Sequence, residues 1–151
     1  MFARGESIQI DASPEAVFDY LADVSKHGEW AADGIVSQRE PGPERGVGVR
    51  FTSRVNVLGE NVARGVVVEA DRPRRFVYEV EDRTGHWRWT MTFRLEGSGT
   101  QLIHAFERIK APLWVRLGQI PIYRFAGRPG IRRGLANIKA HLGNDRSTQM
   151  G

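Results

Sequence analysis

Polar and apolar residues follow two different periods along the chain. Their alternation over residues 6–10 predicts a short half-buried strand. Ser13 and Pro14 then predict a helix start, because a serine side chain can cap free backbone N–H groups and proline tolerates the first helical position. Apolar residues at helical spacing continue this helix: Val17, Phe18, Leu21 and Val24. A second short helical turn is expected over residues 24–30.

From residue 35 to residue 110 the period is 2, which predicts a series of strands. The first long strand has one row of residues opposite its wet face: Val47, Val49, Phe51, Ser53, Val55 and Val57. Further strands are expected over residues 62–70, 76–81, 86–95 and 100–109. The clearest alternation puts five side chains on one face: Trp87, Trp89, Met91, Phe93 and Leu95. Evenly spaced turn signals between the strands favour an antiparallel meander.

The final segment returns to the helical period. One stripe of a regular helix is formed by Ile131, Leu135, Ile138 and Leu142. Pro121 and residues 127–130 predict a kink or break, and therefore a shorter, irregular helix over residues 113–126. A sheet with one apolar face must be covered, and only the terminal helix is long enough to cover it. We expect one α+β domain over residues 1–144, with about seven strands curved around this helix, and a flexible tail over 145–151.

Composition narrows the possible functions. The 151 residues suit a single domain, and the absence of cysteine excludes disulfides, thiol catalysis and thiolate metal sites. The first residues lack the apolar region of a signal peptide, and no apolar stretch is long enough for a membrane-spanning helix, so a cytoplasmic protein is expected. The four histidines lack metal-binding spacings, and nucleophile-elbow and P-loop motifs are absent. Neither a metal nor a cofactor is expected.

The net charge of +4 arises from one segment of the chain. Residues 108–144 contain no acidic residue and eight basic ones: Arg108, Lys110, Arg116, Arg124, Arg128, Arg132, Arg133 and Lys139. Trp114, Tyr123 and Phe125 stand between them. This pattern is typical either of a solvated helix face whose arginines pair with acids elsewhere, or of a weak contact with an anionic membrane surface. Nucleic-acid binding is not expected.

Four stretches resemble a known family: residues 10–18, Leu21-Ala22-Asp23 with His27 and Trp30, residues 87–106, and residues 134–139. They are similar to the polyketide cyclase/dehydrase and lipid-transport family of the START-like (Bet v 1-like) superfamily, which has the helix-grip fold. The resemblance covers nearly the whole chain. It implies a cavity between the sheet and the terminal helix. It does not imply one activity, because this superfamily includes binding proteins, transfer proteins and enzymes.

The residues expected to line this cavity are mostly aromatic or apolar, with a few polar groups. They are Trp30, Phe51, Ser53, Val55, Tyr78, Trp87, Trp89, Met91, Phe93, His104, Phe106 and Tyr123. Each has an ordinary structural alternative. The aromatic residues can be plain core, the tyrosine hydroxyls can reach water, and Trp30 can either close the cavity mouth or anchor its helix on the sheet.

His104 is the best catalytic candidate, since an imidazole can orient a ligand or exchange a proton near neutral pH. It shares a face with Leu102 and Phe106, but the opposite register would instead place Ile103 and Ala105 inside. No second catalytic group is apparent from spacing. The sequence therefore favours binding of a hydrophobic small molecule such as a lipid or polyketide. The alternatives are a polyketide aromatase/cyclase-type enzyme that uses the same cavity, and a regulatory protein whose basic helix binds a partner.

Overall fold

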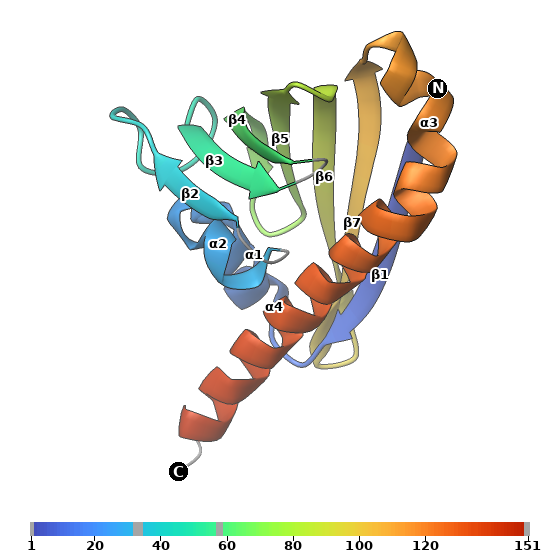
Figure 1. Ribbon diagram of the computed structural model, residues 1–151. Coiled ribbons are helices and arrows are strands. Elements are labelled where there is room, and N and C mark those ends of the chain that lie inside the picture. Colours follow the sequence, from blue (N-terminus) through green and yellow to red (C-terminus); the bar gives the residue numbers. More distant parts are fainter. Residues whose placement is uncertain (1, 32–34, 57–58, 150–151) are drawn as a thin grey trace.

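The computed structural model describes residues 2–31, 35–56 and 59–149, so the predictions for Val57 and for the last two tail residues lie outside it. Seven antiparallel strands form one sheet in the spatial order β1-β7-β6-β5-β4-β3-β2 (Figure 1). The strands are β1 (Ala3–Ile10), β2 (Val36–Arg39), β3 (Arg50–Asn56), β4 (Glu60–Asp71), β5 (Arg75–Asp82), β6 (Gly85–Glu96) and β7 (Gly99–Lys110). The helical elements are α1 (Pro14–Ala22), η1 (Val24–Lys26), α2 (His27–Trp30), α3 (Leu113–Ile122), η2 (Tyr123–Gly127) and α4 (Arg128–Gln149).

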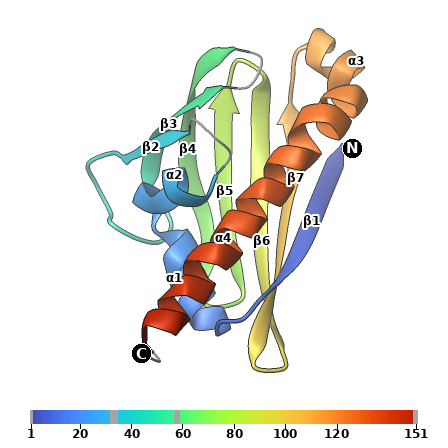
Figure 2. The same ribbon diagram turned by 60° about the horizontal axis from the view of Figure 1, so that its bottom comes forward.

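Helices α1, α2 and α4 pack on one face of the sheet. Helix α4 crosses this face diagonally, and α1 and α2 lie at its far end beside α4 (Figures 1 and 2). The core forms between these helices and the inward side chains of the strands, and its centre includes Phe51, Phe76, Met91, Leu102 and Ile138. The predicted α+β helix-grip architecture, with a curved sheet around a C-terminal helix, is confirmed.

Local sequence signals account for several of the boundaries. Ser13 caps α1 as predicted, since its hydroxyl accepts a hydrogen bond from the Ala16 backbone N–H at 3.2 Å. The predicted long strand starts too early, because β3 begins at Arg50 and Val47 is exposed between two glycines with positive φ, Gly46 and Gly48. Leu95 also departs from the predicted inward row, because it lies near the end of β6, beyond the helices, and is exposed.

The irregular helix predicted after residue 112 is present, but the chain does not break there. α3 includes Pro121 and leads into η2, a π-helical turn of five residues, which leads directly into α4. Proline lacks an N–H donor, and a wider turn re-pairs the backbone around it. The Tyr123 N–H bonds to the carbonyls of both Gln119 and Ile120. α4 continues to Gln149, past the predicted end at residue 142, and flexibility of the tail stays a prediction.

Helix α4 is attached to α2 by hydrogen bonds as well as by packing. Asn137 Nδ2 donates to the Trp30 carbonyl at 3.1 Å, and the His141 Nε2 lies 3.1 Å from the Glu29 carbonyl. These carbonyls lie at the C-terminal end of a four-residue helix, where intrahelical partners are lacking. The terminal helix thereby fixes the position of Trp30. Among the described residues, no helix combines the length and apolar character needed to span a bilayer.

Candidate functional site

His104 points into the interior, between the sheet and the helices. It is only 5% exposed, and Leu102 on the same face of β7 is fully buried. Its Nε2 lies 3.4 Å from the hydroxyl of Tyr78, a buried residue two strands away on β5. The tautomer of the imidazole decides which of the two groups donates. The register with His104 inside is therefore the one that the chain adopts, and the Tyr78 hydroxyl contacts His104 instead of water.

Trp30 supplies a third polar group to the same region. It is 4% exposed, and its ring centroid lies 5.9 Å from that of His104. The Cε3–Cζ3 edge of the indole faces Gly134 on α4, so Nε1, on the opposite side of the ring system, points away from this helix. This buried Nε1 has no hydrogen-bond partner among the described residues. In contrast, the corresponding atom of Trp87 donates to the Thr84 hydroxyl at 3.1 Å.

His27, which is half-buried, completes the cluster formed by Trp30, Tyr78 and His104, which we call the buried polar cluster. Its ring stacks on Trp30 at a centroid distance of 4.6 Å and lies 6.1 Å from the Tyr78 ring. His27 is not among the site residues predicted from the sequence. The sequence feature that could have identified it is the i, i+3 spacing of His27 and Trp30, which puts both side chains on one face of a helical turn.

Burial keeps the cluster uncharged. It lowers the pKa of His27 to about 4 and, with some effect from His27, lowers the pKa of His104 to about 3. Burial also raises the pKa of the Tyr78 hydroxyl. The physical cause is the same for all three, since a poorly hydrated interior disfavours the charged form of each group. At neutral pH the cluster therefore consists of two neutral imidazoles, a phenol and an indole N–H.

A row of aromatic side chains leads from this cluster towards η2. Trp89 lies 4.9 Å from His104, Phe106 lies 5.0 Å from Trp89, and Tyr123 lies 5.7 Å from Phe106, as centroid distances. Trp87 lies beside the row, 5.7 Å from Phe106. We call Trp89, Phe106 and Tyr123 the aromatic row. All four side chains keep partial exposure, unlike the closely packed centre of the core.

The remaining predicted lining residues have mainly structural contacts. Met91 is fully buried and Phe93 packs on Phe18, with ring centroids 5.3 Å apart. Phe51 packs beside Tyr78 at 5.9 Å, while the Ser53 hydroxyl pairs with that of Ser37 at 3.0 Å. The Tyr123 hydroxyl, in turn, donates to Glu6 at 3.3 Å. The side chain of Val55 lies outside the described part of the structure.

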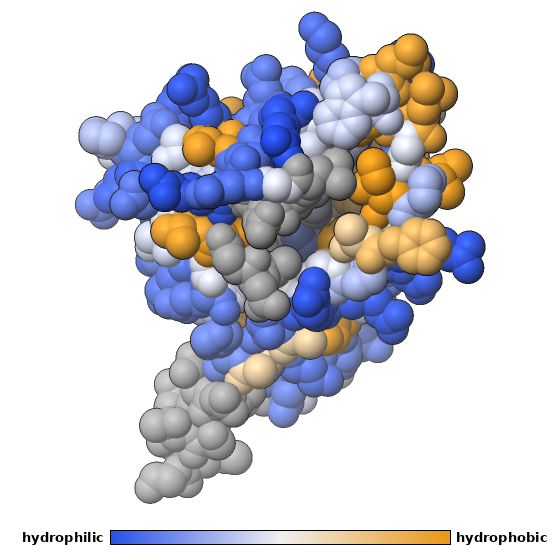
Figure 3. All heavy atoms as spheres, viewed as in Figure 1, coloured by the Kyte–Doolittle hydropathy of each residue, from blue (hydrophilic) through white to orange (hydrophobic). Residues whose placement is uncertain are grey.

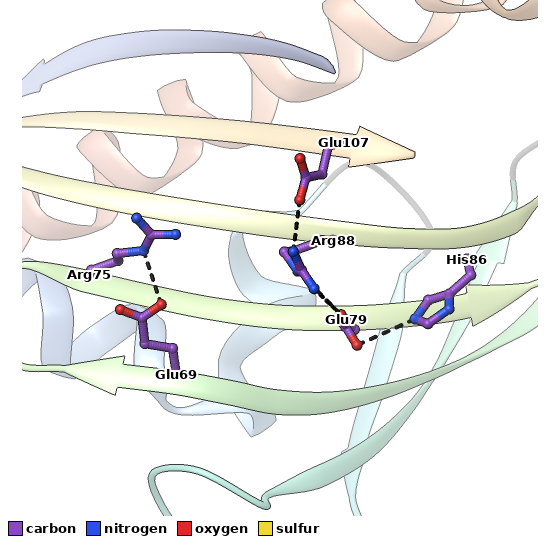
Figure 4. Close-up of polar contacts among 6 residues, drawn as sticks. All are labelled: Glu69, Arg75, Glu79, His86, Arg88 and Glu107. Atoms are coloured by element: carbon purple, nitrogen blue, oxygen red, sulfur yellow. Dashed lines mark hydrogen bonds and ion pairs between the residues drawn. The ribbon is translucent and has the colours of Figure 1, made fainter. Parts of the chain in front are cut away.

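The outer face of the sheet carries a separate network of charged side chains (Figure 4). Arg88 on β6 bonds to Glu79 on β5 at 2.8 Å and to Glu107 on β7 at 3.0 Å, and His86 lies 3.4 Å from Glu79. Bonding to Glu79 raises the pKa of Arg88. These contacts link β5, β6 and β7 on the face of the sheet away from α4. Two surface depressions over β2–β5 also open on this outer side, and Val62 lies in the walls of both.

Comparisons with known proteins agree with this architecture. Residues 2–143 match the family described as polyketide cyclase/dehydrase and lipid transport. No curated protein matches the chain.

Solved structures with the same fold include a protein from Thermus thermophilus, with a TM-score of 0.74, 15% identity, and coverage of 95% of this chain and 99% of that one. A START superfamily protein from Mycobacterium smegmatis has a TM-score of 0.71 and 13% identity, with coverage of 94% and 97%. A protein from Chromobacterium violaceum has a TM-score of 0.67 and 18% identity, with coverage of 93% and 96%. At these identities the structures establish the fold alone. The family match, which extends over nearly the whole chain, assigns this protein to the polyketide cyclase/dehydrase and lipid transport family.

Proposed function

We propose that the protein binds a hydrophobic small molecule, such as a lipid or polyketide, between the inner face of the sheet and α4. The aromatic row and Trp87 supply apolar surface that is partly exposed. Covering such surface is favourable by about 25 cal/mol per Å². A bound molecule would complete this side of the core.

The unpartnered indole N–H of Trp30 is the observation that carries the proposal. A buried donor without an acceptor costs about 1–3 kcal/mol, so such groups are rare unless a ligand or water satisfies them. An acceptor oxygen on the ligand would remove this cost. His104 and Tyr78 lie beside the indole and would orient the same polar end. The expected ligand is therefore apolar over most of its surface and carries one carbonyl, carboxyl or hydroxyl oxygen.

An enzyme of the polyketide cyclase type is the second candidate, and the contact between Tyr78 and His104 favours it. A general acid or base works best with a pKa near the working pH. The low pKa of His104 and the raised pKa of Tyr78 suit hydrogen bonding at neutral pH better than proton transfer. Binding without turnover is therefore the function that the cluster supports best. If His104→Ala abolishes turnover of a poly-β-ketone while the fold is retained, the protein is an enzyme.

Two probes of almost equal shape test the ligand site directly. Fluorenone carries a carbonyl oxygen, and fluorene has the same three rings without it. We expect fluorenone to bind at least about fivefold more tightly, because only its oxygen accepts a hydrogen bond from the Trp30 indole. Quenching of tryptophan fluorescence measures both affinities, and native mass spectrometry of the purified protein checks for a co-purified ligand.

The variant Trp30→Phe keeps an aromatic ring and removes the N–H donor. It should bind the two probes equally, whereas Leu95→Ala, at the exposed end of β6, should keep the preference of the wild type. Failure of the wild-type protein to bind either probe or any co-purified apolar molecule would contradict the proposed function. A preference for fluorenone that survives in Trp30→Phe would remove the indole from the site.

For a protein that carries such a molecule, we also propose contact with an anionic membrane surface through the basic C-terminal segment. The charge of residues 108–144 supports this contact. The cytoplasm is the proposed location.

A further inference from the structure

Helix α3 presents its apolar stripe to solvent, which is the reverse of an ordinary surface helix. Leu113, Leu117 and Ile120 follow each other at helical spacing and are all exposed, and Leu117 is 77% exposed. The opposite side of α3 packs on the protein through the buried Val115. In Figure 3 apolar side chains gather over α3 at one corner of the molecule. The stripe therefore is not part of the core.

Two exposed aromatic side chains extend this surface. Trp114 lies next to the stripe on α3, and Phe125 lies on η2, where it is as exposed as Leu117. We call Leu113, Trp114, Leu117, Ile120 and Phe125 the α3 patch. Single exposed apolar residues are common, but a contiguous group of this kind marks an interaction surface. Tryptophan in particular prefers the boundary between water and lipid.

Two arginines lie beside the α3 patch. Arg116 and Arg124 are exposed beside it, and the Arg124 guanidinium lies 5.8 Å from the centre of the Phe125 ring. Within the described part of the chain no carboxylate pairs with either arginine, whereas Arg128 is held by Glu6 at 2.6 Å. The absence of acidic residues over 108–144 leaves this end of the molecule positively charged.

We propose that α3 and η2 form a docking surface for an anionic lipid bilayer. The apolar stripe would enter the headgroup region while Arg116 and Arg124 contact the lipid phosphates. This combination of one apolar face with cations at its edge is what interfacial helices use. A second copy of the chain fits the surface less well, because a symmetric pair would bring the same arginines close together.

The docking surface also lies at one end of the aromatic row. Tyr123 belongs to η2, between α3 and α4, and its ring contacts Phe106 at 5.7 Å. A ligand that moves between the bilayer and the buried polar cluster would pass along these rings. This last step rests on the proposed ligand site. The docking of α3 and η2 specifies the surface for the membrane contact proposed above, and it does not require a bound ligand.

Flotation with lipid vesicles tests the docking surface on the full chain. We expect the wild type to bind vesicles of phosphatidylcholine with phosphatidylglycerol, and to bind pure phosphatidylcholine at least about tenfold more weakly. Arg116→Gln with Arg124→Gln should lower binding by about fivefold for each charge removed and reduce its dependence on salt. Leu117→Gln with Ile120→Gln should lower it about tenfold or more while the charges remain.

The matched control is Leu95→Gln, which removes an apolar side chain of nearly equal exposure, 71%. Leu95 pairs with Thr100 at the turn between β6 and β7, at the opposite end of β7 from α3. The control variant should bind like the wild type. Equal binding to neutral and anionic vesicles, no binding to either, or equal loss in Leu95→Gln would overturn the proposal. So would light scattering that shows a dimer dispersed by Leu117→Gln with Ile120→Gln. Fluorenone binding without vesicles should be unchanged in these α3 variants, so a failure of docking is distinguishable from a failure of the ligand site.

Discussion

At the scale of single residues, the distinctive feature of the interior is a pair of imidazoles that burial keeps neutral. His27 and His104 lie within one aromatic cluster, and neither forms an ion pair with a carboxylate among the described residues. Protonation of either ring would place a charge in a poorly hydrated space. In the proposed ligand site, these groups would form hydrogen bonds without carrying a charge.

The unfavourable protonation of these rings predicts how stability depends on pH. The unfolded chain binds protons at its histidines below about pH 6.5, while the folded chain resists protonation until the pH approaches about 4 for His27 and about 3 for His104. The free energy of unfolding should therefore fall as the pH falls below about 6.5, by about 1.4 kcal/mol per pH unit for each histidine. Urea unfolding between neutral and mildly acidic pH measures the slope.

His27→Gln should remove one histidine's share of this slope, and the same substitution at His86, on the outer face, is the matched control. A stability that stays constant through this range would show that both imidazoles accept protons in the folded protein.

At the scale of elements, close approach between neighbours decides which small residues are essential. Gly65 on β4 lies under the ring of Phe51 on β3, and a Cβ at this position would overlap the ring. Gly134 on α4 is different, because a Cβ there would meet Trp30 at no less than 3.5 Å, an ordinary contact distance. Two glycines in the same fold therefore have opposite tolerance for a methyl group.

We predict opposite effects for the same substitution. Gly65→Ala should lower the free energy of unfolding by about 1–3 kcal/mol, because the Phe51 ring must move within a packed core. Gly134→Ala should raise it by up to about 1 kcal/mol, because alanine is the better helix former and the space is free. Chemical denaturation of both variants measures the two changes. A destabilised Gly134→Ala protein would show that α4 lies too close to Trp30 to accept a methyl group at this position.

At the scale of the whole molecule, hydrogen bonds join the long terminal helix to the short helices after β1, on the face of the sheet that these helices cover. Asn137 and His141 bond to the carbonyls that end α2. A buried bond from Thr100 to the Ala12 carbonyl, 2.7 Å long, ties the start of β7 to the turn before α1. Segments from both ends of the sequence thus close the same core.

Asn137→Ala should lower the free energy of unfolding by about 1 kcal/mol, because the Trp30 carbonyl loses its donor. Lys139→Ala, an exposed position on the same helix, serves as the control. Urea unfolding gives the stability change. Fluorenone binding should weaken in Asn137→Ala alone, since only this change loosens Trp30. An Asn137→Ala protein as stable as the control would mean that packing alone holds α4 on α2.

Much of the fold follows from the two periods in the sequence, because alternation and helical spacing report which side chains one face can bury. The alternation showed that His104 and Leu102 share one face of β7. Whether this face points into the interior depended on which side of the sheet α4 covers. The π-helical turn was not predictable, since Pro121 and the nearby glycines indicate an irregularity without its form. His27 was missed because its role depends on contacts with Tyr78 and Trp30 that only the folded chain brings together.

The attachment of α4 to α2 has a consequence for the protein during its synthesis. Until α4 leaves the ribosome, the nascent chain has a finished meander with Met91, Leu102 and the aromatic row uncovered on one side. Such a surface is prone to aggregation, which is the hazard that chaperones counter. The synthesis of α4 therefore provides the cover for this apolar surface, and a chain terminated before Leu135 would be a target for proteolysis.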